Sequence, residues 1–159
     1  MTTELSATSL RVQAALDAAG ATGQVRVLDD SARTAADAAA ALGVAVGAIA
    51  NSLVFAADGE AVLVMTSGAH RADTVRLAAL LGAAVVKRAD PDLVRSATGF
   101  AIGGVAPVGH PAPLRTIVDT ALAAYDVIWA AGGTPETVFP TTYDELVTMT
   151  GGTPAEVGD

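Results

Sequence analysis

The chain of 159 residues carries a net charge of −8 at pH 7, no cysteine and two histidines. This length predicts one domain over 1–159, and the missing cysteines exclude disulfides, thiol catalysis and thiolate metal sites. We expect neither a cofactor nor a metal, although a site built from carboxylates alone stays open. Nine Lys and Arg against 17 Asp and Glu argue against DNA as a partner and against extensive contact with RNA phosphates.

The sequence shows no sign of a membrane or export segment. No apolar run approaches the roughly 20 residues that cross a bilayer. The first residues also lack the basic start and the apolar block of a signal peptide. We therefore expect a cytoplasmic protein with no membrane partner.

The first part of the chain alternates helix-like and strand-like segments. Apolar spacing predicts a helix over 6–19 that ends at Gly20, and alternation predicts a short strand over 24–28. An alanine-rich helix is predicted over 34–42, with Thr34 as its N-cap.

Two apolar, β-branched runs, 49–56 and 61–66, flank the dipeptide Asp58-Gly59. Asp-Gly between such runs is a strong short-range signal for a hairpin. We therefore expect two antiparallel strands here, followed by a helix over 73–81.

The second half of the chain continues the alternation. Its predicted elements are a strand over 83–87, a helix that opens at Asp90-Pro91, strands over 116–119 and 127–130, and a closing helix over 142–150. We expect the tail, 151–159, to be loose. This order of elements predicts a mixed α/β fold with a central mixed β-sheet and flanking helices.

A glycine-rich loop follows the fourth predicted helix, where Ala97–Pro107 holds a Thr-Gly-aromatic turn and then Gly-Gly-x-x-Pro. Glycine at 99, 103 and 104 lets the backbone take positive φ and approach a ligand closely. Amides that point into one concavity can hold an anion or an oxyanion, such as the carbonyl oxygen of an ester. On its own the motif is more typical of an ordinary turn between strands, so the neighbouring segments decide its interpretation.

The segments around this loop match one known family in order. Ile49–Phe55 resembles a family strand that bears a lysine at its third position. Thr98-Gly99-Phe100 with Gly103–Pro107 resembles the family's substrate loop, and Ala131–Gly133 is similar to a small-Gly-Gly turn on the far side of the same pocket. The family is the YbaK and prolyl-tRNA-synthetase-associated group, and the resemblance runs from about Val25 to Leu146.

The resemblance implies a mixed sheet with flanking helices and a hydrolase for the ester of wrongly charged tRNA. In that family loop amides hold the ester, the lysine orients the substrate, and a water or the neighbouring ribose hydroxyl takes part. The catalytic residues that it implies here are Asn51, Gly103 and Gly104. The substrate contacts that it implies are Thr98, Gly99, Phe100, Pro107, Ala131, Gly132 and Gly133.

The sequence departs from the family at chemically important positions. Asn51 stands where the family has its lysine, and a neutral amide forms hydrogen bonds about half as strong as charge-assisted ones. Ala131 and Val138 stand where some members carry a serine and an aspartate. We expect a pocket that keeps its backbone parts and loses much of its side-chain chemistry.

Two further residues are candidates for substrate binding. Arg71, between His70 and Asp73, follows the second hairpin strand and could reach a carboxylate or phosphate that Asn51 cannot hold by charge. The same group is more typical of a helix start with Asp73 as its cap. His110 follows the glycine-rich loop and could act as a base near neutral pH, although a lone loop histidine is more typical of a polar surface group.

Three hypotheses follow from these residues. The first is an aminoacyl-tRNA deacylase that removes a small amino acid from the 3′ end of mischarged tRNA. The second is a binding module that holds an aminoacyl ester, an amino acid or an aminoacyl-tRNA synthetase without turnover. The third is a hydrolase for a smaller ester that uses Arg71 or His110. In each case a charge of −8 predicts that any contact with RNA is small and local.

Overall fold

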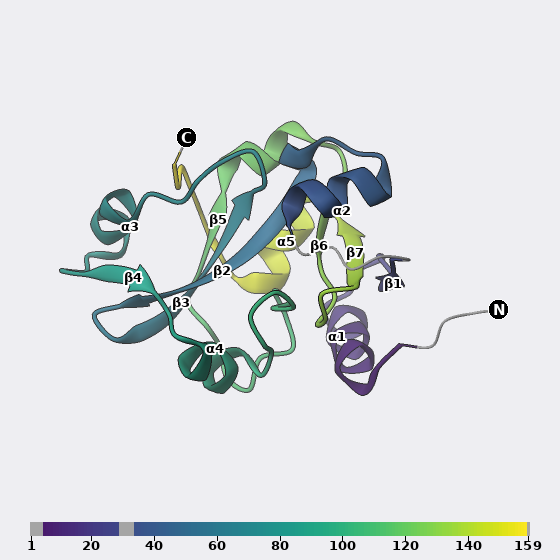
Figure 1. Ribbon diagram of the computed structural model, residues 1–159, viewed down its shortest axis with the longest axis horizontal. Helices are drawn as coiled ribbons and strands as arrows, with labels where there is room; N and C mark the ends of the chain where they lie inside the picture. The colour runs from purple at the N-terminus through teal and green to yellow at the C-terminus, as the bar shows by residue number, and fades with distance from the viewer. Residues whose placement is uncertain (1–4, 29–33, 159) are drawn as a thin grey trace.

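The computed structural model describes residues 5–28 and 34–158, and in them one eight-stranded mixed sheet flanked by helices (Figure 1). The first elements are α1 (Ala7–Ala18), β1 (Arg26–Val27), α2 (Ala35–Leu42), the 3₁₀-helix η1 (Val46–Ala48), β2 (Ile49–Ala57), β3 (Glu60–Ser67) and α3 (Thr74–Leu81). The others are β4 (Val86–Arg88), α4 (Pro91–Thr98), β5 (Thr116–Asp119), the 3₁₀-helix η2 (Thr120–Ala124), β6 (Ile128–Ala131), β7 (Thr137–Thr141), α5 (Tyr143–Thr150) and β8 (Thr153–Ala155). The predicted fold class is confirmed.

The sheet has the strand order β1-β7-β6-β2-β3-β5-β8, and β4 pairs with β2. The predicted hairpin is present, because β2 and β3 pair antiparallel around Asp58 and Gly59, whose φ angles of 49° and 87° suit a two-residue hairpin turn. Its register places Asn51 opposite Thr66. The amides of Val85 and Ala84 donate to the Asp58 carboxylate and hold its pKa below the ordinary value, which ties the turn to β4.

Helices cover both faces of this sheet. On one face α1, α4 and α5 enclose the largest core cluster, around Leu16, Phe100 and Leu146. On the other face α3 packs over Phe55, and α2 packs over Ile49. Side chains alternate between the two faces of a strand, so the face of Ile49 and Phe55 is also the face of residue 51.

The predicted helix boundaries agree with the caps in the structure. The N-caps are Thr34, Asp73, Asp90 and Thr142, and each accepts a hydrogen bond from an amide in the first turn of its helix. α2, α3 and α5 end at glycines with φ near 60–70°, a conformation that costs glycine little. Asp73 is therefore the N-cap of α3, as the interpretation of this segment as a helix start predicted.

The prediction of a loose tail is wrong for the residues that the structure describes. β8 pairs parallel with β5, and Val157 is fully buried against the α3 side of the sheet. The amide of Asp73 also donates to the carbonyl oxygen of Val157 over 2.8 Å. The tail is therefore part of the fold, because three residues of strand pairing and one buried valine hold it there.

β7 was not predicted, and β4 lies slightly later than the strand expected over 83–87. Pro140 within β7 argues against a strand by composition. The structure accommodates it because β1 pairs only with Thr137 and Val138, so Pro140 lies beyond the end of that ladder.

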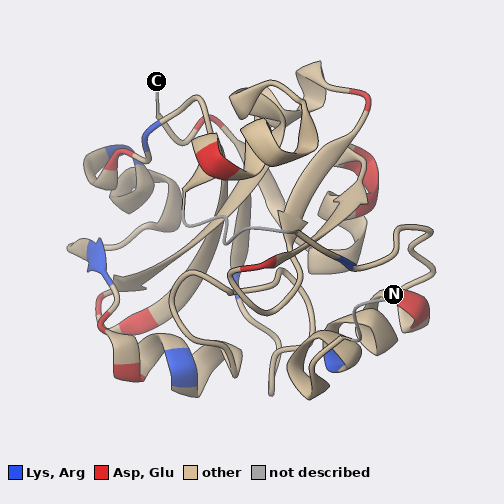
Figure 2. Cartoon of the chain, turned by 45° about the vertical axis from the view of Figure 1, so that its right-hand side comes forward, with Lys and Arg blue, Asp and Glu red and all other residues tan. Residues whose placement is uncertain are grey.

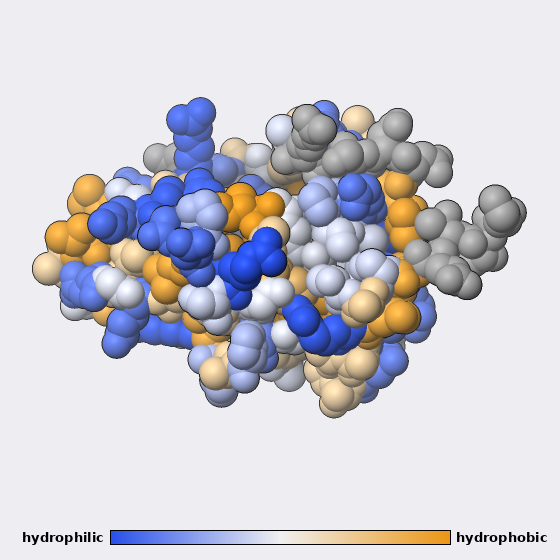
Figure 3. All heavy atoms as spheres, turned by 60° about the horizontal axis from the view of Figure 1, so that its bottom comes forward, coloured by the Kyte–Doolittle hydropathy of each residue, from blue (hydrophilic) through white to orange (hydrophobic). Residues whose placement is uncertain are grey.

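None of the helices in the described part of the chain is long and apolar enough to cross a bilayer. The face that carries α1 and α4 shows hydrophobic atoms in separate patches among hydrophilic ones (Figure 3).

Candidate functional site

Asn51 lies on β2 between the parts of the sheet that α2 and α3 cover. Its side chain is exposed, although the strand on either side of it is largely buried. Two cavities meet at this residue, one on the α2 side and one on the α3 side. We call them the small cavity and the basic cavity.

The small cavity has a volume of about 80 Å³, well below the roughly 300–1,000 Å³ of a site for a drug-sized ligand. It brings together residues from α2, β2, the glycine-rich loop, β6 and β7. They include Ala35, Ala38, Asn51, Gly103, Trp129, Ala131, Thr134, Pro135 and Val138. Most of this wall is apolar, so the cavity suits a small side chain better than a charged group.

The glycine-rich loop reaches this cavity through Gly103. Gly103 lines it with φ 93°, and its N–H has no acceptor among the described residues. The Gly104 amide is not free to hold a ligand, because it donates to the carbonyl oxygen of Ala101 over 3.1 Å. Gly104 is needed for close packing, because a Cβ there would lie 2.8 Å from the Cα of Thr134.

The turn at 131–133 forms the opposite wall. Ala131 lines the small cavity, whereas Gly132 and Gly133 lie buried behind it. The Gly132 amide donates to the carbonyl oxygen of Thr137 over 2.8 Å. The Thr137 hydroxyl, 2.8 Å from the hydroxyl of Thr134 and 3.2 Å from that of Ser9, holds the turn against α1.

Three predicted substrate contacts anchor the loop and do not line the small cavity. The Thr98 hydroxyl is fully buried, donates to the carbonyl oxygen of Val94 over 2.7 Å and accepts from the amide of Phe100 over 3.0 Å. Gly99 ends α4 in the left-handed conformation. The Phe100 ring belongs to the main core, with the guanidinium of Arg11 4.7 Å from its centroid.

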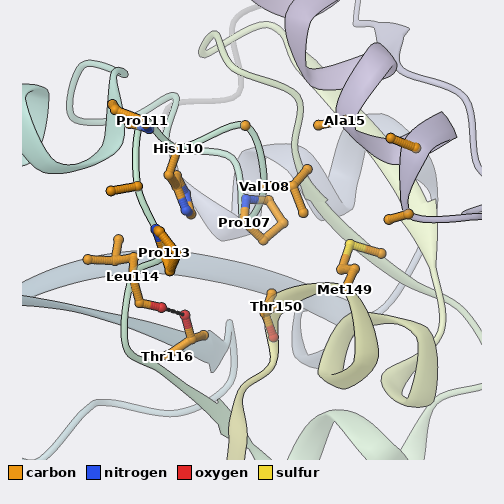
Figure 4. A pocket seen from close by; sticks show the side chains of 14 residues that line it. Ala15, Pro107, Val108, His110, Pro111, Pro113, Leu114, Thr116, Met149 and Thr150 are labelled. Carbon is orange, nitrogen blue, oxygen red and sulfur yellow. Dashed lines mark hydrogen bonds between the residues drawn. The ribbon is translucent and has the colours of Figure 1, made fainter.

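Pro107 and His110 line a separate cavity, shown in Figure 4, which Ala15 of α1 and Met149 of α5 also border. The His110 ring nitrogen Nε2 lies 2.8 Å from the carbonyl oxygen of Ala106. Burial lowers the pKa of His110 below its ordinary value of 6.5. The ring is therefore neutral at pH 7, and the structure does not bring it to the cavity that Asn51 lines.

Arg71 does share a cavity with Asn51. The basic cavity, of about 420 Å³, is lined by both residues and by Thr66, His70 and Arg88. The sequence interpretation missed Arg88 and Thr66. Thr66 could have been found from the hairpin register, which places it opposite Asn51, whereas Arg88 depends on the pairing of β4 with β2.

The His70 ring lies against Asp119 beside this cavity, with 3.1 Å between Nδ1 and Oδ2. Asp119 is almost fully buried and accepts the amides of Ser67 and Ala121, each over 3.0 Å. The Asp119 carboxylate is therefore occupied by these contacts within the fold. Together with His70, it connects the segment after β3 to the start of η2.

Comparisons with known proteins agree with this geometry. A family described as "Aminoacyl-tRNA editing domain" matches residues 29–149. A solved structure of a candidate trans-editing enzyme for prolyl tRNA synthetase is 43% identical, with a TM-score of 0.93, over 98% of this chain and 99% of its own.

Curated relatives match over shorter stretches. The proline–tRNA ligase of Nitratidesulfovibrio vulgaris (strain DP4) is 36% identical over 101 residues, which are 64% of this chain and 17% of the ligase. That of Geobacillus thermodenitrificans (strain NG80-2) is 35% identical over 92 residues, 58% of this chain and 16% of the ligase. The chain thus spans about a sixth of the ligases that it matches. Because the family model covers most of its length, this chain belongs to the aminoacyl-tRNA editing domain family.

Proposed function

We propose that this protein is an aminoacyl-tRNA deacylase, which hydrolyses the ester between a small amino acid and the 3′-terminal ribose of a mischarged tRNA. The observation that carries the proposal is the meeting of Asn51, Gly103 and Ala131 in one small cavity. These residues come from three distant segments, and each lies where the family resemblance implies a functional position. The family and the 43% identical trans-editing neighbour support the same activity.

The size of the cavity indicates the substrate. A volume of about 80 Å³ lined by alanines, a proline and a tryptophan suits a small amino acid such as alanine or serine. In this proposal the Gly103 amide, which has no acceptor among the described residues, donates to the ester carbonyl, and the Asn51 side-chain amide donates to the same group.

Water is the attacking group in this proposal. The hydroxyls of Thr134 and Thr137 at the cavity bond to each other, and the Ser52 hydroxyl donates to the sulfur of Met65 over 3.3 Å. No His, Asp or Glu of the described residues lines the small cavity, so none of these hydroxyls has the adjacent base that a nucleophile requires. Positioning and the amide of Gly103 therefore supply the catalysis.

The proposed partners follow from the relatives. Two matched curated proteins are proline–tRNA ligases, and the similar structure is described as acting for prolyl tRNA synthetase. We therefore propose that the substrate is a tRNA wrongly charged by such a synthetase, that the synthetase itself is a partner, and that both meet the protein in the cytoplasm.

Single-turnover hydrolysis of alanyl-tRNA and seryl-tRNA, both mischarged, tests the proposal with the wild type, Asn51→Ala and Asn51→Lys. We expect slow hydrolysis by the wild type and slower hydrolysis by Asn51→Ala. Asn51→Lys should be about 5- to 150-fold faster, because a restored charge-assisted contact contributes about 1–3 kcal/mol in the transition state. A fall in rate with lysine would show a pocket rebuilt for another ligand.

A binding module is the second candidate, and the neutral Asn51 in place of the family lysine favours it. Folded protein that hydrolyses neither tRNA in any of the three variants would exclude the deacylase for these substrates. Tight binding of a non-hydrolysable alanyl-adenosine amide by the same protein would then identify the module.

A further inference from the structure

The basic cavity is an unusual local environment in a protein of net charge −8. Arg71 and Arg88 line it, and no Asp or Glu of the described residues does. Within residues 5–28 and 34–158 neither guanidinium has a carboxylate within 4.0 Å. In Figure 2 basic segments lie at β4 and just before α3, on the same side of the molecule. Two cations thus line one space, and no carboxylate of the described residues neutralises them.

Both arginines are held in place by the fold. The Arg88 guanidinium lies 5.6 Å from the ring centroid of the buried Phe55, so its charge rests on an aromatic surface. Arg71 precedes the segment that the tail holds, where the Asp73 amide bonds to the carbonyl oxygen of Val157. Gly158 packs so closely that a Cβ there would overlap the Arg71 carbonyl oxygen. The Arg88 guanidinium and the Arg71 backbone therefore have defined positions in the protein without a ligand.

A third polar group in this cavity lacks a partner. The Thr66 side chain is 2% exposed, and its hydroxyl has no hydrogen-bond partner among the described residues. A buried hydroxyl without a partner is costly. An oxygen-rich ligand in the cavity would supply the missing acceptor.

We propose that the basic cavity binds a phosphodiester of the single-stranded 3′ end of the RNA substrate, with Arg71 and Arg88 as the cations and Thr66 as an additional donor. This assignment rests on the proposed function. Asn51 lies on both cavities, so an aminoacyl group in the small cavity and a phosphate in the basic cavity would place the ester between them, at Asn51. The arginines then carry the positive charge that residue 51 lacks.

A phosphodiester fits the chemistry better than the alternatives. Guanidinium groups bind phosphate through two parallel hydrogen bonds, which is a reason why arginine is frequent at such sites. A volume of about 420 Å³ has room for a phosphate with part of its nucleotides, whereas the small cavity does not. The site also explains how so acidic a chain can hold RNA, because it needs only one or two phosphates at the 3′ end.

Binding of the trinucleotide CCA, of adenosine and of inorganic phosphate to the full chain tests the proposal by calorimetry, without any need for hydrolysis. We expect the wild type to prefer CCA to adenosine, and Arg71→Gln and Arg88→Gln each to weaken CCA binding about 10-fold. Each variant should also reduce the slope of log K against log salt by about 0.7. Arg76→Gln and Lys87→Gln are the matched controls, because they remove the same charge from the adjoining helix and strand but do not line the cavity.

Other outcomes would overturn the proposal. They are no binding of CCA by the wild type, equal losses in the control variants, and inorganic phosphate that binds as tightly as CCA through the same arginines. The last result would indicate a site for a free anion. The proposed function has its own readout, since CCA binding that depends on the arginines without any hydrolysis would refute the deacylase and keep the phosphate site. Hydrolysis by the wild type, together with CCA binding that is unchanged in both arginine variants, would refute the phosphate site and keep the deacylase.

Discussion

The two cavities that meet at Asn51 differ in almost every property except their shared residue. The small cavity has apolar walls and one free backbone amide, whereas the basic cavity has two arginines without carboxylate partners among the described residues. The small cavity depends on the close approach of the glycine-rich loop to the turn that holds Gly133 and Thr134. The basic cavity depends on long side chains from a strand and a loop. In the proposed function, shape selects the aminoacyl group in the small cavity and charge holds the nucleic acid in the basic cavity. The two cavities should therefore respond to different substitutions.

Gly104→Val should have the largest effect, and it should act on the small cavity. A Cβ at this position would lie 2.8 Å from the Cα of Thr134 and 2.9 Å from the carbonyl oxygen of Gly133, so the cavity wall must move. We expect a loss of about 3 kcal/mol in the free energy of unfolding and at least about 100-fold in hydrolysis. Denaturant titration and single-turnover kinetics measure the two effects.

Gly103→Ala adds a Cβ to the same loop without such a clash. Its added Cβ would be 4.0 Å from the nearest side-chain atom, so only the φ of 93° opposes it, at about 1–2 kcal/mol. A folded Gly104→Val protein with wild-type hydrolysis would show that the wall of the small cavity does not position the substrate.

Val157→Ala should affect the basic cavity and leave the small cavity unchanged. Val157 is fully buried under the segment that follows Arg71, and truncating it should cost about 1–2 kcal/mol. We expect weaker CCA binding with unchanged hydrolysis of alanyl-adenosine, which has no phosphate. Val75→Ala, the same change at a valine that is 79% exposed, should alter neither, and equal losses with both substrates would contradict a local effect.

The smallest expected effect concerns His110, which lies at neither cavity. Burial lowers its pKa in the folded state, so the unfolded chain binds more protons below pH 6.5. The stability that the neutral ring contributes is present above that pH and falls as the pH decreases, by less than about 1.4 kcal/mol per pH unit. His110→Gln should therefore unfold with a weaker pH dependence between pH 7 and 5 and should hydrolyse the substrate at the wild-type rate. An unchanged pH dependence of the unfolding free energy would refute the role given to burial.

Local signals in the sequence predicted much of the fold correctly. Asp58-Gly59 predicted the β2–β3 hairpin, and Thr34, Asp73 and Thr142 predicted helix starts, because turns and caps depend on residues only a few positions apart. The tail was misread as loose, since its stability comes from pairing with β5 and from burial of Val157. Neither contact leaves a mark in local composition.

For the site, the sequence by itself determined which segments contribute to it and that residue 51 is a neutral asparagine where the family has a lysine. The order of the motifs identified the family, and it marked Asn51, Gly103 and Ala131 as positions to examine. Only the tertiary structure decided which of the proposed residues meet. It brought Arg71 and Arg88 to Asn51, placed His110 in another cavity, and showed that Thr98 and Phe100 anchor the loop. The reason is physical: a motif fixes the local backbone, whereas the position of a side chain in space depends on strand pairing and helix packing between residues far apart in the chain.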